Sequence, residues 1–161
     1  MLVTDGTILC LLIGTVILAS FFWRPRIWLN DLPDDIQSRA APMTAEEKTW
    51  AMKIGLFVVL TLLIGLTVTA LRFDLDNGFL LVALHAYLVF QLFNLFDMVV
   101  LDWGVMLLID PAKPPIQGTE HAPGWRDFQF HALKSLKGVV LGAPFAIVAA
   151  GIAWLIHFLI G

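Results

Sequence analysis

Four polar side chains interrupt a long apolar segment in the middle of the chain. They are Gln91, Asn94, Asp97 and Asp102, in a segment that is otherwise mostly apolar from residue 79 to residue 109. At 100° per residue of helix they fall on one side, within an arc of about 140°. Carboxylates at membrane depth are costly and face protein or water with a partner. We therefore expect Asp97 and Asp102 to have a specific role near the end of this segment.

The loop that follows returns more polar groups toward these carboxylates. Residues 110–137 contain prolines and glycines that fix turns at low entropic cost, which favours an ordered loop. Two carboxylates with a Glu and a His suit a hard or borderline divalent cation, or acid–base chemistry on a lipid headgroup. The expected catalytic or metal-binding residues are Asp97, Asp102, Glu120 and His131. The expected supporting residues are Asn94, which orients a carboxylate, with Gln91, His121 and Asp127.

No motif narrows the reaction further. The sequence contains no HExxH, phosphate-binding glycine loop or nucleophile elbow. The polar groups therefore allow a second interpretation, a hydrogen-bonded plug that ties the loop to the helices. The alternative to a membrane-interface site is a non-catalytic accessory or assembly subunit of a larger membrane complex. Ion or proton conduction is a third hypothesis, which the polar stripe supports over only half of the membrane.

Two histidines raise the question of a different cofactor. His85 and His157 are expected at similar depth near the same end of two helices, which is the minimum geometry for a bis-histidine b-type haem. Interfacial solvation of each histidine explains the same pattern more simply. We therefore do not favour haem.

Composition sets the class of protein that must hold these groups. Of the 161 residues, 59% are apolar and 14% are charged, and the mean hydropathy is +0.85. A soluble domain is nearer half apolar and a quarter charged, which excludes ordinary soluble, fibrous and disordered proteins. A net charge of −3 without a basic tract argues against nucleic-acid binding. The single cysteine, Cys10, excludes a disulfide framework and a Cys-based metal site.

Four apolar stretches are long enough to cross a bilayer as helices. About 20 mostly apolar residues are needed, because the hydrocarbon core cannot satisfy a bare backbone. The expected spans are residues 7–23, 54–71, 79–101 and 138–160, joined by long loops at 24–53 and 110–137. The sequence thus predicts an all-α membrane protein, with four helices forming one domain as an antiparallel bundle.

Basic residues are distributed unevenly between the two sides of this bundle. Every Lys and Arg except Arg72 lies in or beside the two long loops, which share one side when four helices cross. Basic residues accumulate on the cytoplasmic side of membrane proteins. The sequence therefore predicts cytoplasmic loops, both termini outside, and a location in the inner (plasma) membrane of a bacterium.

Two helix starts are expected within the first long loop. Asp31 is placed to cap a short surface helix, with Pro33 in its first turn. Thr44 and Glu47 have capping-box spacing, so the second long helix is expected to begin about two turns before the lipid. We interpret the charges of this loop as a solvated face.

The fourth span carries small residues at every fourth position. They are Gly138, Gly142, Ala146 and Ala150, which share one side of a helix and let a neighbouring backbone approach closely. Packing within the bundle is the favoured interpretation, and a homodimer or another membrane protein partner docking on the same residues is the alternative. Pro144 removes one backbone hydrogen bond from this helix.

A sequence pattern links the third span, the second loop and the start of the fourth span. It runs N-x-x-D-x-x-x-x-D-W from Asn94 to Trp103, then Gly118-Thr-Glu120, then D-F-x-F-H from Asp127 to His131, with Gly138 following. This pattern resembles an uncharacterised family of small four-span membrane proteins of bacteria and archaea. The resemblance implies a shared membrane fold and makes these positions the best site candidates. It implies no activity, substrate or cofactor.

Overall fold

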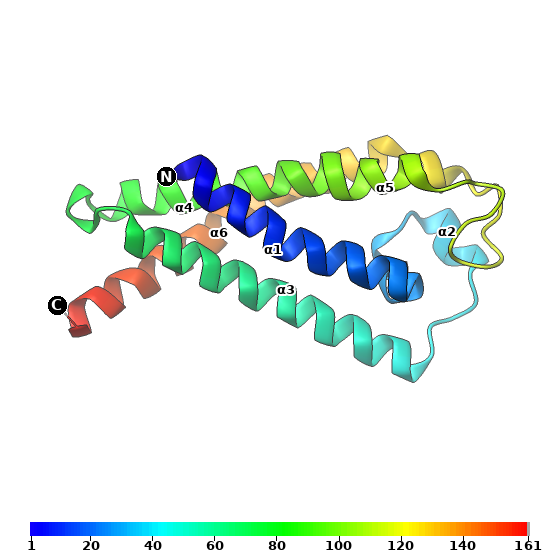
Figure 1. Ribbon diagram of the computed structural model, residues 1–161, viewed down its shortest axis with the longest axis horizontal. Helices are drawn as coiled ribbons and strands as arrows, with labels where there is room; N and C mark the ends of the chain where they lie inside the picture. Colours follow the sequence, from blue (N-terminus) through cyan, green and yellow to red (C-terminus); the bar gives the residue numbers. More distant parts are fainter. Residues whose placement is uncertain (161) are drawn as a thin grey trace.

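The computed structural model describes residues 1–160, and every regular element in that part of the chain is helical. Four long helices lie side by side along the length of the molecule (Figure 1). In chain order the elements are α1 (Leu2–Trp23), η1 (Pro25–Asp31), α2 (Asp34–Arg39), α3 (Ala45–Arg72), η2 (Leu75–Asn77), α4 (Phe79–Phe96), η3 (Asp97–Asp102), α5 (Trp103–Leu108), η4 (Pro123–Arg126) and α6 (Phe128–Ile160). The all-helical expectation is confirmed.

Four helices are long and apolar enough to cross a membrane, namely Leu2–Trp23, Ala45–Arg72, Phe79–Leu108 and Phe128–Ile160. Large apolar side chains on their outward faces, such as Leu11, Leu80 and Phe158, are 62%, 82% and 83% exposed. Exposed apolar surface on this scale suits lipid rather than water. Each helix extends beyond the expected span, because hydropathy marks only the apolar part of a helix that continues into the loop regions.

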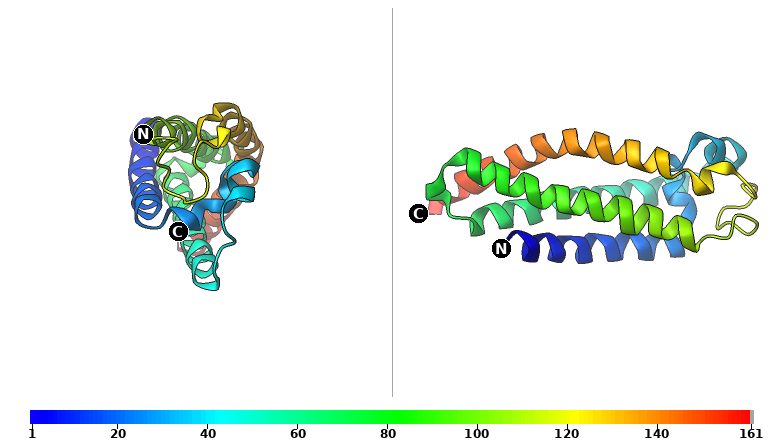
Figure 2. Two further views of the ribbon diagram at one scale, coloured as in Figure 1. Left: turned by 90° about the vertical axis from the view of Figure 1, so that its right-hand side faces the viewer. Right: turned by 90° about the horizontal axis from the view of Figure 1, so that it is seen from above.

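The two ends of the molecule differ in what they carry. The N-terminus, η2 and the C-terminus lie toward one end, which we call the turn end (Figure 1). The opposite end, which we call the loop end, carries η1, α2 and residues 109–127 (Figure 2). The two long loops of the sequence therefore meet at the loop end.

Small residues of α6 let this helix approach α4 closely. An ideal Cβ atom built on Gly142 would lie 2.6 Å from Cδ1 of Phe90 and 2.6 Å from Nε2 of Gln91. Ala146 and Ala150 are buried farther along the same helix. The small-residue stripe is thus used for packing within the chain, as the favoured interpretation of its spacing predicted.

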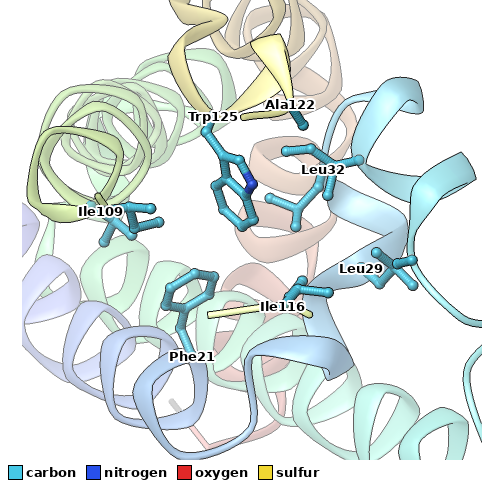
Figure 3. Close-up of a cluster of buried hydrophobic side chains, with 10 residues drawn as sticks. Phe21, Leu29, Leu32, Ile109, Ile116, Ala122 and Trp125 are labelled. Atoms are coloured by element: carbon cyan, nitrogen blue, oxygen red, sulfur yellow. The ribbon is translucent and has the colours of Figure 1, made fainter. Parts of the chain in front are cut away.

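A hydrophobic core holds the two loops together at the loop end (Figure 3). Its buried residues come from α1, the end of α5 and both loops, and they include Phe21, Leu29, Leu32, Ile109, Ile116, Ala122 and Trp125. Trp125 is 1% exposed, and its indole N–H donates to the carbonyl and hydroxyl oxygens of Thr119 at 3.1 Å each. The proline-rich second loop therefore has a packed structure of its own rather than trailing in solvent.

Of the two helix starts expected in the first loop, one is confirmed and the other is wrong. The capping box of α3 is confirmed, since the Thr44 hydroxyl accepts from the Glu47 N–H and the Glu47 carboxylate accepts from the Thr44 N–H. The expectation that Asp31 caps the short helix is wrong. That helix, α2, begins at Asp34 and has no side-chain cap. Asp31 is instead the last residue of η1, and Leu32 and Pro33 separate η1 from α2.

A π-helical segment, η3, interrupts the third long helix. Asp97 and Asp102 are its first and last residues, and the Trp103 N–H that follows donates to the carbonyl of Met98, five residues earlier. This bonding puts more residues into each turn than an α-helix has. Asp97 and Asp102, which are five residues apart, consequently project in more similar directions than they would in a regular α-helix. Such π-segments occur frequently at functional sites.

Candidate functional site

A pocket of about 330 Å³ lies at the loop end, bounded by α1, α3 and the η3–α5 segment. Most of its wall is apolar, with Ile17 and Phe21 from α1 and Val58 and Val59 from α3 among the lining side chains. The polar side chains of the lining are Asp31, Trp28, Asp97, Trp125, Asp102, His131 and Lys134. The volume is at the lower end of the range found for small-molecule sites.

Asp102 and His131 form the best-defined pair in this pocket. Oδ2 of Asp102 lies 2.9 Å from Nδ1 of His131, and the His131 side chain is 4% exposed. Nδ1 is fully buried and makes no hydrogen bond of good angular geometry, so the contact is a bent one. A carboxylate against Nδ1 nevertheless fixes the orientation of the imidazole and leaves Nε2 for a ligand.

Asp97 is the pocket acid that has no protein partner. It lines the same pocket as Asp102 and His131, yet within residues 1–160 no hydrogen bond or ion pair reaches its carboxylate. Asp31, by contrast, lies 3.1 Å from the ammonium group of Lys134, and both of these side chains are about half exposed. Asp97 is therefore the group most available to a molecule bound in the pocket.

The start of α6 is positioned by side chains that bond to backbone groups. Oδ1 of Asp127 accepts the N–H of Phe130 at 2.9 Å and so caps the first turn. The indole N–H of Trp103 donates to the carbonyl of Phe128 at 3.2 Å, which ties this turn to the end of η3. His131 is thereby held in the first turn of α6, beside the η3 carboxylates.

The end of α5 is closed by the guanidinium group of Arg126. Its Nη2 donates to the carbonyl of Ile109 at 2.8 Å, and its Nη1 contacts the carbonyl of Met106. These carbonyls have no helical partner beyond the C-terminus of α5, so Arg126 satisfies them and fixes the second loop under the helix. Hydrogen bonds therefore tie the second loop to the helices beside the pocket, as the plug considered from the sequence would do.

Gln91 and Asn94 face α6 rather than the pocket. The Asn94 amide donates to the carbonyl of Ser135 at 3.1 Å and to the Gln91 side chain at 3.3 Å. Gln91 and Tyr87 donate to the carbonyl of Val139 at 3.4 and 3.2 Å. The polar stripe of the third helix is therefore divided. Its first two members hold α6, and its two carboxylates line the pocket.

Glu120 and His121 lie apart from Asp97, Asp102 and His131. Both are exposed, and neither lines the pocket. The N–H groups of Glu120 and Gly118 lower the pKa of the Glu120 carboxyl below its ordinary value of 4.5. His121 adopts a positive φ of 56° in the turn beside it. Glu120 thus stabilises the loop turn and does not approach the other three expected ligands.

The expected metal set is consequently incomplete in this geometry. Within the part of the chain that the structure describes, no three His, Cys, Asp or Glu side chains converge as a metal ion would require. The arrangement of Asp97, Asp102 and His131 instead provides acid and base groups along one side of an apolar pocket.

Sequence reasoning missed two of the charged pocket residues. Lys134 follows His131 by one helical turn, and Asp31 was interpreted only as a helix cap. The spacing of His131 and Lys134 places both side chains on one face of α6. That spacing was the available signal, whereas the approach of Asp31 depends on how the two loops fold together.

A second polar cluster at the turn end was also missed. Oδ1 of Asp5 lies 2.8 Å from Nη1 of Arg72, and its Oδ2 lies 3.7 Å from Nε2 of His85. The Asp5 side chain is fully buried, and His85 stacks on Phe73 with ring centroids 4.6 Å apart. Asp5 precedes the span expected from residue 7, so hydropathy alone gave no reason to consider it.

His85 and His157 have different environments. His85 is buried within this turn-end cluster, whereas His157 is exposed on α6. Similar depth along two helices therefore does not give the two histidines similar environments.

Comparisons with known proteins give no functional assignment, so any assignment rests on the geometry of the site. No protein-family model, curated protein or solved structure matches the chain.

Proposed function

We propose that the protein is a multi-pass protein of the bacterial inner (plasma) membrane, with its four helices in an antiparallel bundle. Both termini then lie outside and the loop end lies at the cytoplasmic face. The distribution of basic residues supports this orientation, because every Lys and Arg except Arg72 belongs to or borders the two long loops. The pocket is accordingly at the level of the inner leaflet.

We further propose that this pocket binds a membrane amphiphile with its headgroup against Asp97, Asp102 and His131. The observation that carries the proposal is the meeting of an apolar wall and a charged end in one pocket. Gly55 and Val59 of α3 line the pocket and are exposed, and they belong to a helix long and apolar enough to cross a membrane. We expect the pocket to be accessible to acyl chains along this wall.

The polar end is suited to proton transfer with a bound headgroup. Asp102 orients His131 through Nδ1, and a neutral imidazole with a free Nε2 accepts a proton from a nearby hydroxyl or amine. Asp97, which has no protein partner, supplies a second acid or base on the same side of the pocket. Proton transfer from a positioned side chain contributes roughly 10²–10⁴-fold to a reaction rate.

Two glycines in open surroundings allow a matched test. An ideal Cβ atom meets nothing within 4 Å at Gly55 or at Gly151, but only Gly55 lines the pocket. Gly55→Leu should insert an isobutyl group at the pocket opening without disturbing helix packing. Gly151→Leu adds the same group to α6 away from the pocket. Both variants and the wild type are purified in mild detergent, incubated with bacterial lipid extract, washed, and analysed by mass spectrometry for bound amphiphile.

The wild type and Gly151→Leu are expected to retain the same amphiphile, and Gly55→Leu is expected to lose most of it. Retention of an unchanged amount by Gly55→Leu would show that the pocket is not the binding site. A wild type that retains no amphiphile would refute the proposed function as a whole.

A further inference from the structure

The polar end of the pocket holds more acidic than basic side chains. Its carboxylates belong to Asp31, Asp97 and Asp102, and they face one ammonium group, on Lys134, and one imidazole. Lys134 is already paired with Asp31, and His131 with Asp102. Asp97 is thus the acidic group of the pocket that no basic side chain pairs with. A headgroup with its own negative charge would find no unpaired cation there, and it would meet acidic groups across a wall that does not screen charge as water does.

The pocket also lacks a donor for the Asp97 carboxylate. A carboxylate beside an apolar wall is unfavourable unless it accepts hydrogen bonds. Within residues 1–160 no side chain or backbone group supplies one. A bound molecule that donates from an amine or a hydroxyl would satisfy this acceptor, whereas a phosphate or carboxylate headgroup would add further acceptors.

The size of the pocket limits the apolar part of the ligand. A volume of about 330 Å³ is at the lower end of the range for drug-sized ligands, so the pocket holds a headgroup and only the first part of a long chain.

We infer that the pocket selects amphiphiles whose headgroup donates hydrogen bonds and carries no negative charge, as a long-chain amine or alcohol does. This inference rests on the proposed function and specifies its ligand class. Recognition combines the Asp97 carboxylate as acceptor with His131, which is 4% exposed and held by Asp102. The apolar wall binds the chain without regard to the headgroup.

The test compares four amphiphiles with one saturated chain and different headgroups, namely an alkyl amine, an alkyl alcohol, a fatty acid and an alkyl phosphate. Each displaces a fluorescent single-chain amphiphile from the full-length protein in mild detergent at neutral pH. The amine and the alcohol are expected to bind at least about tenfold more tightly than the acid and the phosphate. The reason is that an anionic headgroup would lie within a few ångströms of acidic side chains, where like charges repel. Equal or tighter binding of the two anionic amphiphiles would overturn the inference.

Two charge variants with opposite expected effects identify Asp97 as the selecting group. Asp97→Asn should reduce the preference for the amine over the phosphate by about tenfold, whereas Lys134→Gln should increase it. Asp34→Asn, which removes an exposed carboxylate of α2 outside the pocket, is the control and should leave the ratio unchanged. If Asp97→Asn does not fold, Lys134→Gln still decides the question. An unchanged ratio in the folded charge variants would refute the role of pocket charge.

The outcomes separate this inference from the proposed function. Both the inference and the proposed function would be refuted if none of the four amphiphiles displaces the probe and Gly55→Leu leaves binding of the probe unchanged. Displacement by all four with equal affinity, abolished by Gly55→Leu, would preserve the pocket as a binding site and refute only its selectivity.

Discussion

Replacing Gly142 with alanine should weaken the contact between α4 and α6. The added Cβ atom would lie 2.6 Å from the Phe90 ring, which no side-chain contact tolerates without a shift. Phe90 is 7% exposed and packs beside Phe145, with ring centroids 5.8 Å apart, so its ring cannot simply turn away. Overpacking of this kind costs about 1–3 kcal/mol. Alanine recovers about 1 kcal/mol of helix propensity, so we expect a net destabilisation of up to about 2 kcal/mol.

Gly151→Ala on the same helix is the matched control. Its added Cβ atom meets nothing within 4 Å, so only the gain in helix propensity remains. This variant should be neutral or more stable by up to about 1 kcal/mol. The two alanine variants should therefore differ by about 2 kcal/mol in free energy of unfolding, although each adds one methyl group to α6.

Equilibrium unfolding of the detergent-solubilised protein with increasing sodium dodecyl sulfate measures this difference, with helix content followed by circular dichroism. Gly142→Ala should unfold at a lower fraction of the denaturing detergent than the wild type. If Gly142→Ala is as stable as Gly151→Ala, α6 does not approach α4 as closely as described and the packing argument fails.

Three further outcomes are expected. Asp5→Ala should lower the free energy of unfolding by about 1–3 kcal/mol, because the fully buried carboxylate loses its bond to Arg72; an unchanged unfolding midpoint would contradict this. Arg126→Lys should lower the free energy of unfolding by about 1–2 kcal/mol, because an ammonium group cannot bridge two carbonyls as the planar guanidinium does. Amide exchange in residues 109–127 should become faster, and wild-type exchange rates in this variant would argue against the cap. Because the pKa of Glu120 is lowered, its stabilisation of the turn is present above the ordinary value of 4.5 and is lost as the pH falls through the lowered value. The protection of the Gly118 amide against exchange should fall over that acidic range in the wild type, and a Glu120→Gln variant with the same pH dependence would refute this assignment.

The long helices were predictable because their signal is local. About 20 apolar residues in a row leave few alternatives to a membrane helix, and the Thr44 and Glu47 capping box acts within one turn. The ordered second loop was likewise expected from its prolines and glycines, whose effect on the backbone does not depend on distant partners.

The pocket was only partly predictable because its geometry depends on the backbone and on long-range contacts. Asp97 and Asp102 were placed on a regular α-helix, and nothing in their spacing specified the π-segment that brings them closer to one face. Asp31 comes to Lys134 from 103 residues away in the sequence. Glu120 was grouped with them by residue type, although its carboxylate bonds within its own turn.

The contact between Asp5 and Arg72 has a consequence for the order in which the protein is assembled. α1 carries a carboxylate whose partner follows 67 residues later in the chain, at the end of α3. Until α3 has been synthesised, this charge at the turn end of α1 must stay in water or enter the membrane without its partner. We therefore expect α1 to reach its final depth only after α3 has been inserted.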